Sequence, residues 1–523
     1  MEEEENTRTP RAVFMAFGTK GDVNPIVAIA AAFAIDQRQY HVVLITHSAH
    51  KNLSTYLAAN NVTYFQVSTP PVLSAYRDDD ASGSVESLFS MKKKLIAREH
   101  RQECLSIMEM VFGDDPKMDG DFILINFFAL EGWNLAELFQ IRCIVAAPYV
   151  VPYSAPSSFE RRFKKEFPLL YKYLQESPVD QVCWKDVIHW MWPLFTEEWG
   201  SWRSMALNLS PCPFTDPVTG LPTWHDWPRS PLLLYGFSKE VVECPGYWPS
   251  RVRVCGFWFL PEEWQYSCNK CRQVLTPLPS GHLSTNDDMC LQHANLHWFL
   301  KTSKTVLPIF VGLSSIGSMG FLTNPGAFLQ VLEAVMEITG YRFILLTAGF
   351  EPLDAAIQLI ATKTCSLSDQ KPQVEDGILL FSDHLLCFSG TVPYNWLFQR
   401  CAVAIHHGGS GSTAAALHAG IPQIICPFML DQFYWAEKMF WLGVAPEPLQ
   451  RNHLVPDRDD DVSIVQAANG LSNAISYALS PKVKACASEV AERISSEDGV
   501  GEAVKILKEE VMCQSKIRHQ TSF

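Results

Sequence analysis

The sequence predicts an α/β fold with two doubly wound, parallel-sheet domains that face each other across a cleft. Two observations predict it. Short apolar runs such as AVFMAFG (12–18) and CAVAI (401–405) are each followed by a glycine-containing loop and then an alanine-rich helical segment. A further apolar run follows each helical segment, so both halves contain βαβ units with parallel strands. A chain of 523 residues is also long enough for two domains with separate cores.

The N-terminal half begins with a predicted strand over 12–18, the loop TKGDVNP and a helix. Asn24 is a plausible N-cap and Pro25 suits the first helical position. The run HVVLITH (41–47) is the second strand. Asp22 is thereby placed at the carboxyl edge of the sheet, where open α/β sheets bind ligands. By itself, an Asp in such a turn is ordinarily a turn or capping residue.

The C-terminal half contains the segment HHGGSGSTAAALHAGIPQIICPFMLDQ, His406–Gln432. Its glycine loop opens onto a helix N-terminus, where free N–H groups and the helix dipole favour a phosphate or diphosphate. Glycines let the backbone approach that anion, and hydroxyls add donors. The candidate anion-binding residues are Gly408, Gly409, Ser410, Gly411, Ser412 and Thr413. Asp431 and Gln432 follow the next predicted strand, and a carboxylate and an amide there suit the hydroxyls of a sugar.

Composition excludes several classes of protein. Lys plus Arg number 42 and Asp plus Glu number 56, a net charge of −14 that argues against a nucleic-acid-binding surface. The start MEEEEN is unlike a secretory signal, no apolar run is long enough for a membrane span, and 15 cysteines without a signal are expected to be reduced thiols. We therefore expect a cytoplasmic protein, with peripheral membrane association as a further expectation.

The segment His406–Gln432 resembles the donor-binding signature of UDP-glycosyltransferases of the GT-B fold. It is most similar to the sterol 3-beta-glucosyltransferases, whose pattern is roughly HHGGxGTTAAxxxAGxPxxxxPFxxDQ. The chain departs from that pattern at Ser412, where Thr is usual, and at Leu430, where Gly is common. The segment 231–261 resembles LYGFSxxVV…WPxxVxVxGFWFL of the same family, so the resemblance extends through both halves.

The resemblance implies an inverting transferase that moves glucose from UDP-glucose to a lipophilic hydroxyl, with no cofactor or metal required. Asp22 lies in the family's GDVxP loop and would act as general base. His406 matches the histidine that contacts the donor phosphates, and Ser315 lies in a second phosphate-contacting loop. VPYNWLF stands where the family has VPHDWLF, a segment that receives the uracil and ribose, so Tyr394 and Asn395 replace His and Asp.

The resemblance also implies a division of the chain. We expect a disordered acidic N-terminus (1–10), an acceptor-binding Rossmann-like domain (11–261), a linker or insertion (262–303), a UDP-sugar-binding Rossmann-like domain (304–480) and a C-terminal helical segment that packs back on the first domain (481–523).

The sequence is compatible with more than one acceptor, with two roles for its tryptophans and with a metal site. The acceptor is a sterol or another lipophilic or phenolic molecule, and a catalytically weak nucleotide-sugar-binding protein is a third interpretation. The tryptophan-rich run 184–202 indicates either core packing or an apolar acceptor pocket or membrane-facing lip. The C-x2-C and C-x2-H pairs at Cys268, Cys271, Cys290 and His293 indicate either a structural zinc site or four unrelated residues of an interdomain linker.

Overall fold

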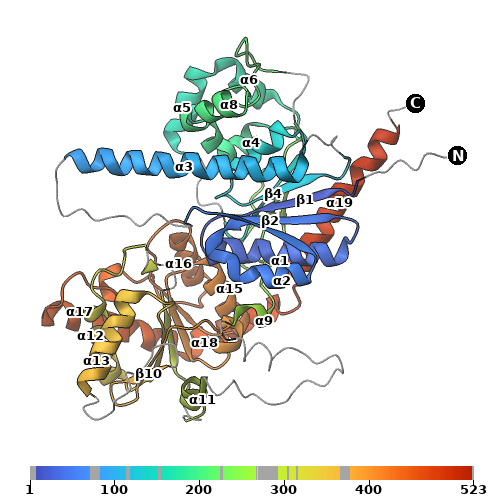
Figure 1. Cartoon of the computed structure of the whole chain (residues 1–523). Helices are drawn as coiled ribbons and strands as arrows, with labels where there is room; N and C mark the ends of the chain where they lie inside the picture. Colours follow the sequence, from blue (N-terminus) through green and yellow to red (C-terminus); the bar gives the residue numbers. More distant parts are fainter. Residues whose placement is uncertain are drawn as a thin grey trace. The chain divides into compact units, whose positions relative to one another are not determined.

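In the computed structural model, the chain divides into two compact units, each built around its own β-sheet (Figure 1). The described residues up to Phe259, together with those from Glu497 onward, form unit 1, and those in Leu260–Ser496 form unit 2. The structure describes residues 8–70, 83–113, 118–150, 155–223, 228–266, 268, 293–302, 306–313, 316–317, 319–364 and 377–520.

The sheet of unit 1 is entirely parallel and has the strand order β3-β2-β1-β4-β5-β6-β7. From β1 to β3 successive strands are added on one side of β1, and from β4 onward they are added on its other side, which is the Rossmann arrangement. The central strands are apolar along their whole length because helices cover both faces of such a sheet. The strands are β1 (Arg11–Met15), β2 (His41–His47), β3 (Val62–Val67), β4 (Phe122–Ile125), β5 (Arg142–Ala147), β6 (Leu233–Tyr235) and β7 (Val252–Val254).

Helices lie on both faces of this sheet, with α1 and α2 on one face and α3 and α4 on the other (Figure 1). The last helix, α19, packs beside α1. The helices of unit 1 are α1 (Lys20–Asp36), α2 (Ser54–Ala59), α3 (Gly83–Phe112), α4 (Glu131–Leu138), α5 (Ser157–Glu166), α6 (Pro168–Glu176), α7 (Trp184–Asp186), α8 (Glu197–Ala206) and α19 (Gly499–Gln520), with short helical turns at Ser48–Leu53, Val187–Met191 and Trp192–Phe195.

Helix α1 starts earlier than the sequence predicts. Its N-cap is Thr19, and Pro25 lies inside the helix rather than at its first position. The side chain of Asp22, three residues after Thr19, accepts a hydrogen bond from the backbone N–H of Thr19 at 2.7 Å. This contact is one half of a capping box, which satisfies a donor that the helix itself leaves free. Asn24 is therefore a helical residue and not the cap.

The sheet of unit 2 has the order β10-β11-β9-β8-β12-β13 and is parallel except for the β10–β11 pair. The strands from β9 to β11 lie on one side of β8, and β12 and β13 lie on its other side, so the strand order reverses between β8 and β12. Its strands are β8 (Ile309–Gly312), β9 (Phe343–Leu346), β10 (Ile378–Leu380), β11 (Leu385–Phe388), β12 (Val403–His406) and β13 (Gln423–Ile425). Its helices are α9 (Glu262–Gln265), α11 (Ala294–Lys301), α12 (Pro325–Thr339), α13 (Glu351–Thr364), α14 (Tyr394–Phe398), α15 (Ser410–Ala419), α16 (Gln432–Trp441), α17 (Asp461–Ala478) and α18 (Pro481–Ile494), with a short turn at Arg451–His453.

The C-terminal segment divides between the two units. Helix α18 packs on α15 and belongs to unit 2, which differs from the prediction that everything from residue 481 joins the first domain. The chain from Glu497 onward belongs to unit 1. There Glu510 of α19 forms ion pairs with Arg142 and Arg251. At the start of α19 the backbone of Gly499 lies close to that of Gly256 and Phe257. This approach requires glycine, because a Cβ atom at Gly499 would lie 2.3 Å from the carbonyl oxygen of Phe257.

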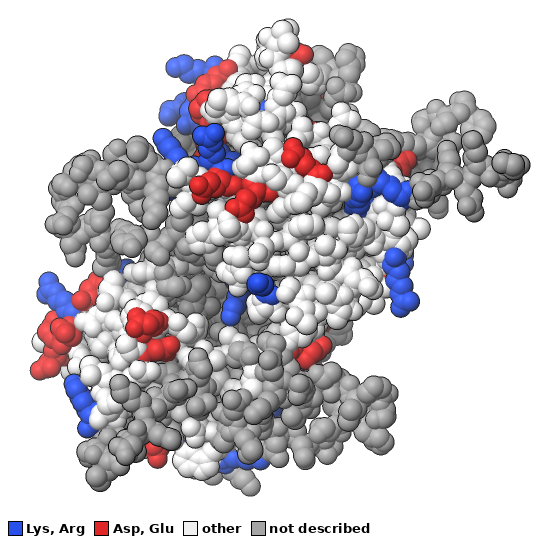
Figure 2. All heavy atoms as spheres, in the orientation of Figure 1, with Lys and Arg blue, Asp and Glu red and all other residues white. Residues whose placement is uncertain are grey.

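Charged side chains of both signs lie near one another on the face drawn in Figure 2, and uncharged side chains separate these groups. Over α5, for example, Arg162 pairs with Glu166 at 3.9 Å. Within the described part of the chain, none of the helices has the length and apolar character needed to cross a membrane.

The tryptophan-rich run contributes largely to the interior of unit 1. Trp184, Trp190 and Trp199 are at most 8% exposed, while Trp192 and Trp202 are partly buried. Trp184 stacks on Phe159 with the ring centroids 6.0 Å apart. Core packing therefore explains three of these five tryptophans.

Candidate active site

The predicted site residues lie at the point in each sheet where the chain direction reverses. In unit 1, Asp22 lies in the first turn of α1, directly after the loop that follows β1, and β1 pairs directly with β4. In unit 2 the glycine loop follows β12, which pairs directly with β8. Ligands of open α/β sheets bind at these switch points, outside the carboxyl ends of the strands. Each unit therefore presents one candidate half-site where its topology favours one.

Asp22 is held by one of its two carboxylate oxygens. Its Oδ2 accepts hydrogen bonds from the Thr19 backbone N–H at 2.7 Å and from the Thr19 hydroxyl at 2.8 Å. Its Oδ1 has no hydrogen-bond partner among the residues that the structure describes. The capping interpretation and the catalytic interpretation are thus compatible, because one oxygen caps α1 while the other is left for a ligand.

The acidity of Asp22 suits a general base. Burial raises the pKa of Asp22 to about 6, although the two hydrogen bonds from Thr19 favour the charged form. At pH 7 the carboxylate is therefore mostly ionised and yet more basic than an exposed aspartate. A base with its pKa near the working pH takes up a proton most effectively.

In unit 2 the glycine loop leads into α15 as predicted. The N-cap of α15 is Gly409, and Gly408 has a φ of +87°, a conformation that favours glycine. A Cβ at Gly408 would also lie 2.7 Å from the Ile425 side chain. Gly411 in the first turn is exposed, and a Cβ there would meet no described residue within 4 Å. None of the described residues blocks this helix N-terminus, which suits an anion site.

The hydroxyls of the loop are less accessible than the glycine backbone. Ser410 and Ser412 are each 7% exposed, and Thr413 is fully buried. The Thr413 hydroxyl has no hydrogen-bond partner among the described residues, and its backbone N–H donates to the carbonyl of Gly409. Backbone N–H groups near Gly411 are therefore better placed than Thr413 to contact a ligand.

His406 is a fully buried histidine with both ring nitrogens engaged. Its Nδ1 accepts from the backbone N–H of Gly408 at 3.0 Å, so Nε2 carries the proton and donates to Gln423 Oε1 at 2.9 Å. Burial lowers its pKa to about 4 and leaves the ring uncharged at neutral pH. Direct contact of His406 with a donor phosphate would require one of these bonds to open. In this structure, its visible role is to fix Gly408.

His407 differs from its neighbour. It is 8% exposed, and its Nδ1 has no hydrogen-bond partner within the described part of the chain. The ring lies against the glycine loop, since a Cβ at Gly409 would be 2.5 Å from its Nε2. Burial lowers its pKa to about 3, so this histidine is also neutral.

Asp431 and Gln432 lie at the start of α16, after β13. Gln432 Oε1 accepts from the backbone N–H groups of Phe428 and Met429 at 2.9 and 3.1 Å. These bonds hold the turn from Phe428 to Gln432. Asp431 Oδ2 accepts from the indole N–H of Trp435 at 3.1 Å. Leu430, where the family commonly has glycine, has a φ of +54°. The glycine preference at this position therefore has a backbone explanation.

The segment VPYNWLF forms the short helix α14. Tyr394 packs against Phe398 in a stacked arrangement with centroids 5.0 Å apart. The guanidinium of Arg400 lies over the Trp396 ring at 4.4 Å. Asn395 Oδ1 is buried and has no hydrogen-bond partner among the described residues. A buried amide oxygen without a partner can still accept one hydrogen bond.

Some predicted residues lie outside the described residues. These include Ser315, Cys271 and Cys290, so the second phosphate loop and the zinc hypothesis have no structural description here. Cys268 and His293 are described, and His293 packs against Phe388 with the ring centroids 5.2 Å apart. Within the described ranges, no group of three or more candidate ligands could hold a metal ion.

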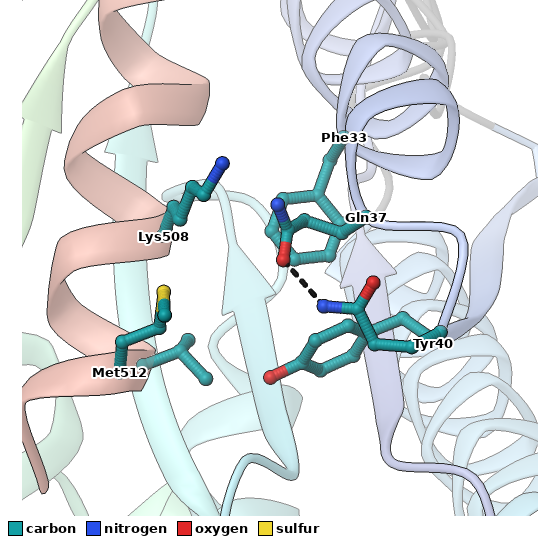
Figure 3. Close-up of a pocket in the computed structure, with 7 residues that line it drawn as sticks. Phe33, Gln37, Tyr40, Lys508 and Met512 are labelled. Atoms are coloured by element: carbon teal, nitrogen blue, oxygen red, sulfur yellow. Dashed lines mark hydrogen bonds between the residues drawn. The ribbon is translucent and has the colours of Figure 1, made fainter. Parts of the chain in front are cut away.

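A pocket of about 290 Å³ lies between the end of α1 and α19 (Figure 3). Phe33, Tyr40 and Met512 line it together with Gln37 and Lys508. Phe33 is eleven residues after Asp22 on the same helix, a distance of about 16 Å along its axis. The pocket therefore lies at the opposite end of α1 from Asp22 and is not part of the candidate site.

Two residues near Asp22 were not identified from the sequence. Asn126 follows β4, and its side chain contacts the backbone of Phe17 and Asp22. His50 Nε2 lies 3.1 Å from the carbonyl oxygen of Gly18. Because a carbonyl oxygen can only accept, Nε2 carries the proton and donates this hydrogen bond. An asparagine directly after an apolar strand is the one feature of the sequence that could have indicated Asn126. Its partner, Phe17, is 109 positions away and is defined only by the order of the strands in the sheet.

Comparison with solved structures identifies the fold. The calicheamicin glycosyltransferase CalG4 matches with a TM-score of 0.56 and 14% identity, over 96% of this chain and 98% of that one. The kitacinnamycin glycosyltransferase matches with a TM-score of 0.54 and 15% identity, over 96% and 99%. The chain has the GT-B glycosyltransferase fold. The predicted fold class is confirmed.

Sequence comparison relates this GT-B chain to the sterol 3-beta-glucosyltransferases. It is 24% identical to UGT80B1 of Arabidopsis thaliana over 501 residues, covering 94% of this chain and 67% of that protein. It is 26% identical to UGT80A2 of the same plant, covering 94% and 64%. It is 24% identical to the Komagataella phaffii enzyme over 522 residues, covering 98% and 35%. The predicted resemblance is confirmed.

A family model also matches the C-terminal part. The erythromycin biosynthesis protein CIII-like C-terminal domain matches residues 386–508, which include the glycine loop, Asp431 and Gln432. The GT-B chain spans about two thirds of the length of the two plant relatives and about one third of the Komagataella phaffii relative.

Proposed function

We propose that this protein transfers glucose from UDP-glucose to the hydroxyl group of a sterol, with inversion at the anomeric carbon. The observation that carries the proposal is the extent of the sequence match. It covers 94–98% of the chain, through both sheets and both candidate half-sites, with proteins named as sterol 3-beta-glucosyltransferases. A glycine loop alone would support only nucleotide binding.

Asp22 supplies the base in this proposal. Its unoccupied Oδ1 takes the proton from the acceptor hydroxyl while the hydroxyl oxygen attacks the anomeric carbon from the side opposite UDP. The C–O bond to UDP breaks as the new glycosidic bond forms, and UDP leaves with the electron pair. The raised pKa of about 6 supports this role, since the carboxylate is ionised at pH 7 but is still able to accept a proton.

The start of α15 receives the diphosphate in this proposal. Backbone N–H groups at Gly411 and its neighbours, together with the positive end of the helix dipole, stabilise the charge that develops on the leaving group. His406 contributes by fixing Gly408 through its Nδ1. Because His406 is neutral, the favourable field comes from the backbone rather than from an imidazolium. Asp431 and the amide nitrogen of Gln432 bind the sugar hydroxyls, and Asn395 Oδ1 accepts from the uracil N–H.

A flat apolar acceptor is supported by the aromatic residues that follow β4. Phe128 is 44% exposed, only two residues after Asn126, which contacts the backbone of Asp22. Phe127 packs against Tyr149 and Trp190 with centroids 6.3 and 6.1 Å apart. An exposed aromatic side chain at the carboxyl edge of the sheet suits a hydrophobic ring system. A sterol is a membrane lipid, so the proposal includes work at a membrane surface from the cytoplasmic side.

The test is transfer from radiolabelled UDP-glucose to a panel of sterols and phenolic compounds, with UDP-glucose hydrolysis followed in parallel. We expect glucosylated sterol from the wild-type chain and at least a hundredfold less from Asp22→Asn, which keeps its shape but cannot act as a base. UDP affinity, measured by calorimetry, should be unchanged in that variant. Product on phenolics only would discard the sterol acceptor. Donor binding without product on any acceptor would discard the transferase proposal in favour of a binding protein.

A further inference from the structure

We propose that Asn126 and His50 are positioning residues that hold the segment Phe17–Asp22 so that Oδ1 of Asp22 is presented to the acceptor. This segment comprises the turn after β1 and the first residues of α1, and is called the Asp22 loop below. This inference rests on the proposed function, because it assigns to Asp22 the role of base. It concerns two residues that do not themselves touch the reacting atoms. A set of hydrogen bonds joins both ends of this loop to the rest of unit 1.

Asn126 uses its whole side-chain amide for this loop. Its Oδ1 accepts from the backbone N–H of Phe17 at 3.2 Å. Its Nδ2 donates to the carbonyl of Phe17 at 2.8 Å and to the carbonyl of Asp22 at 3.3 Å. Asn126 thus ties the first residue of the loop to its last one. It is fully buried, so water cannot take over these bonds without reorganisation.

His50 holds the middle of the loop. Its Nε2 donates to the carbonyl of Gly18 at 3.1 Å, and the side chain is 3% exposed. Burial lowers the pKa of His50, so the neutral ring provides this donor. Gly18 has a φ of +106°, which turns its carbonyl toward His50 while its α-carbon faces Asp22. The contact therefore fixes the peptide that supports the carboxylate.

The ring of Phe17 gives the loop a third, apolar anchor. It packs against His47 and His100 with centroids 4.8 and 4.4 Å apart, and Phe17 is 2% exposed. Burial lowers the pKa of both histidines to about 4, so they stay neutral in the range where Asp22 titrates. Glu131 lies 3.9 Å from His100 and has a pKa raised to about 7 by burial, and it is the neighbouring group that also titrates near neutral pH.

The hydrogen bonds from Asn126 and His50 to the Asp22 loop are called the clamp below. Loss of this clamp has two consequences for Asp22. The carboxylate moves relative to the acceptor, and displacements of about 1 Å can cost about a hundredfold in rate. The carboxylate also gains water, which removes part of the burial that raises its pKa. A variant without the clamp should therefore lose kcat and also show an acidic limb at lower pH. A purely structural role would lower the amount of folded protein without moving that limb.

The test compares Asn126→Ala with Asn134→Ala in the full-length chain. Asn134 is an equally buried asparagine on α4, and its side-chain hydrogen bonds to described residues go to Arg203, from which it accepts at 2.8 Å, and to the carbonyl of Leu130. For Asn126→Ala we expect kcat to fall about 10- to 100-fold, KM for UDP-glucose to stay within about twofold, and the acidic limb to move down by about one pH unit. For Asn134→Ala we expect the limb of the wild type. Glu131→Gln, which removes the other titrating group, should leave the limb in place.

Two further measurements keep the inference testable if Asn126→Ala is poorly folded. His50→Phe removes the donor to Gly18 from the other side of the loop and should move the limb in the same direction. Hydrogen exchange of the segment 13–24 should be faster in His50→Phe and in Asn126→Ala, but not in Asn134→Ala. Unchanged limbs and unchanged exchange in both clamp variants would overturn the inference. A wild-type chain that transfers no glucose would overturn the proposed function alone, because exchange still reports on the clamp.

Discussion

The carboxylate of Asp22 lies directly over the α-carbon of Gly18. A Cβ atom at Gly18 would come within 2.6 Å of Asp22 Oδ2 and 2.9 Å of the Asp22 Cβ. The φ of Gly18, +106°, is itself strained for any residue with a side chain. The loop after β1 can therefore carry its aspartate in this position only because residue 18 is glycine.

Gly18→Ala should displace Asp22. We expect the free energy of unfolding to fall by about 1–3 kcal/mol and kcat to fall at least tenfold, because both the φ and the contact become unfavourable. Thermal unfolding and the transfer assay measure these effects. Gly21→Ala is the matched control, since a Cβ there would meet only the Thr19 hydroxyl, at 3.7 Å. Equal loss of activity in both variants would contradict the close contact as the cause.

The pH dependence of kcat/KM should report the ionisation of Asp22. The base must be deprotonated to act, so activity should fall as the pH decreases through about 6. Thr19→Val removes one hydrogen bond that favours the carboxylate and should move this limb upward. The measurement is a pH profile of kcat/KM for both proteins. A limb near pH 4 in the wild type would contradict the raised pKa.

Gly411→Val should weaken donor binding without destabilising the protein. A Cβ at Gly411 would meet no described residue within 4 Å, so a valine side chain fits the described fold but occupies the position expected for the diphosphate. We expect UDP affinity to fall at least tenfold and the unfolding temperature to change little. Gly246→Val is the control. A Cβ at Gly246 would also meet no described residue within 4 Å, and Gly246 lies in unit 1. Retained UDP affinity in Gly411→Val, measured by calorimetry, would exclude this helix terminus as the site.

Leu430→Gly should stabilise unit 2 slightly. Leu430 is 41% exposed with a φ of +54°, so its side chain gains little from burial while its backbone is strained. Relief of a left-handed conformation is worth about 1–2 kcal/mol and the added flexibility of glycine costs about 0.5–1 kcal/mol, which leaves a gain of up to about 1.5 kcal/mol. Chemical denaturation measures the difference. Leu430→Ala, which keeps the strain, should give no gain.

Local patterns in the sequence were sufficient for the fold class and for the half-site loops. The apolar runs at β1 and β12, the glycines of the two loops and the alanine-rich helices are all adjacent in the chain, and each predicts its own element. Strand β2 has the predicted bounds, 41–47. The start of α1 was predicted five residues too late, because the sequence favoured Asn24 as cap, whereas Thr19 and Asp22 form the cap in the folded chain.

The sequence by itself therefore determined the class of fold, the order of its elements and the positions of Asp22 and the glycine loop. Only the tertiary structure decided which atoms are available. It engages both nitrogens of His406, gives Oδ1 of Asp22 no hydrogen bond from the described residues, and brings Asn126 to the loop through the pairing of β1 with β4. The physical reason is that apolar periodicity encodes local elements, whereas hydrogen bonds between residues about a hundred positions apart depend on the order in which those elements pair.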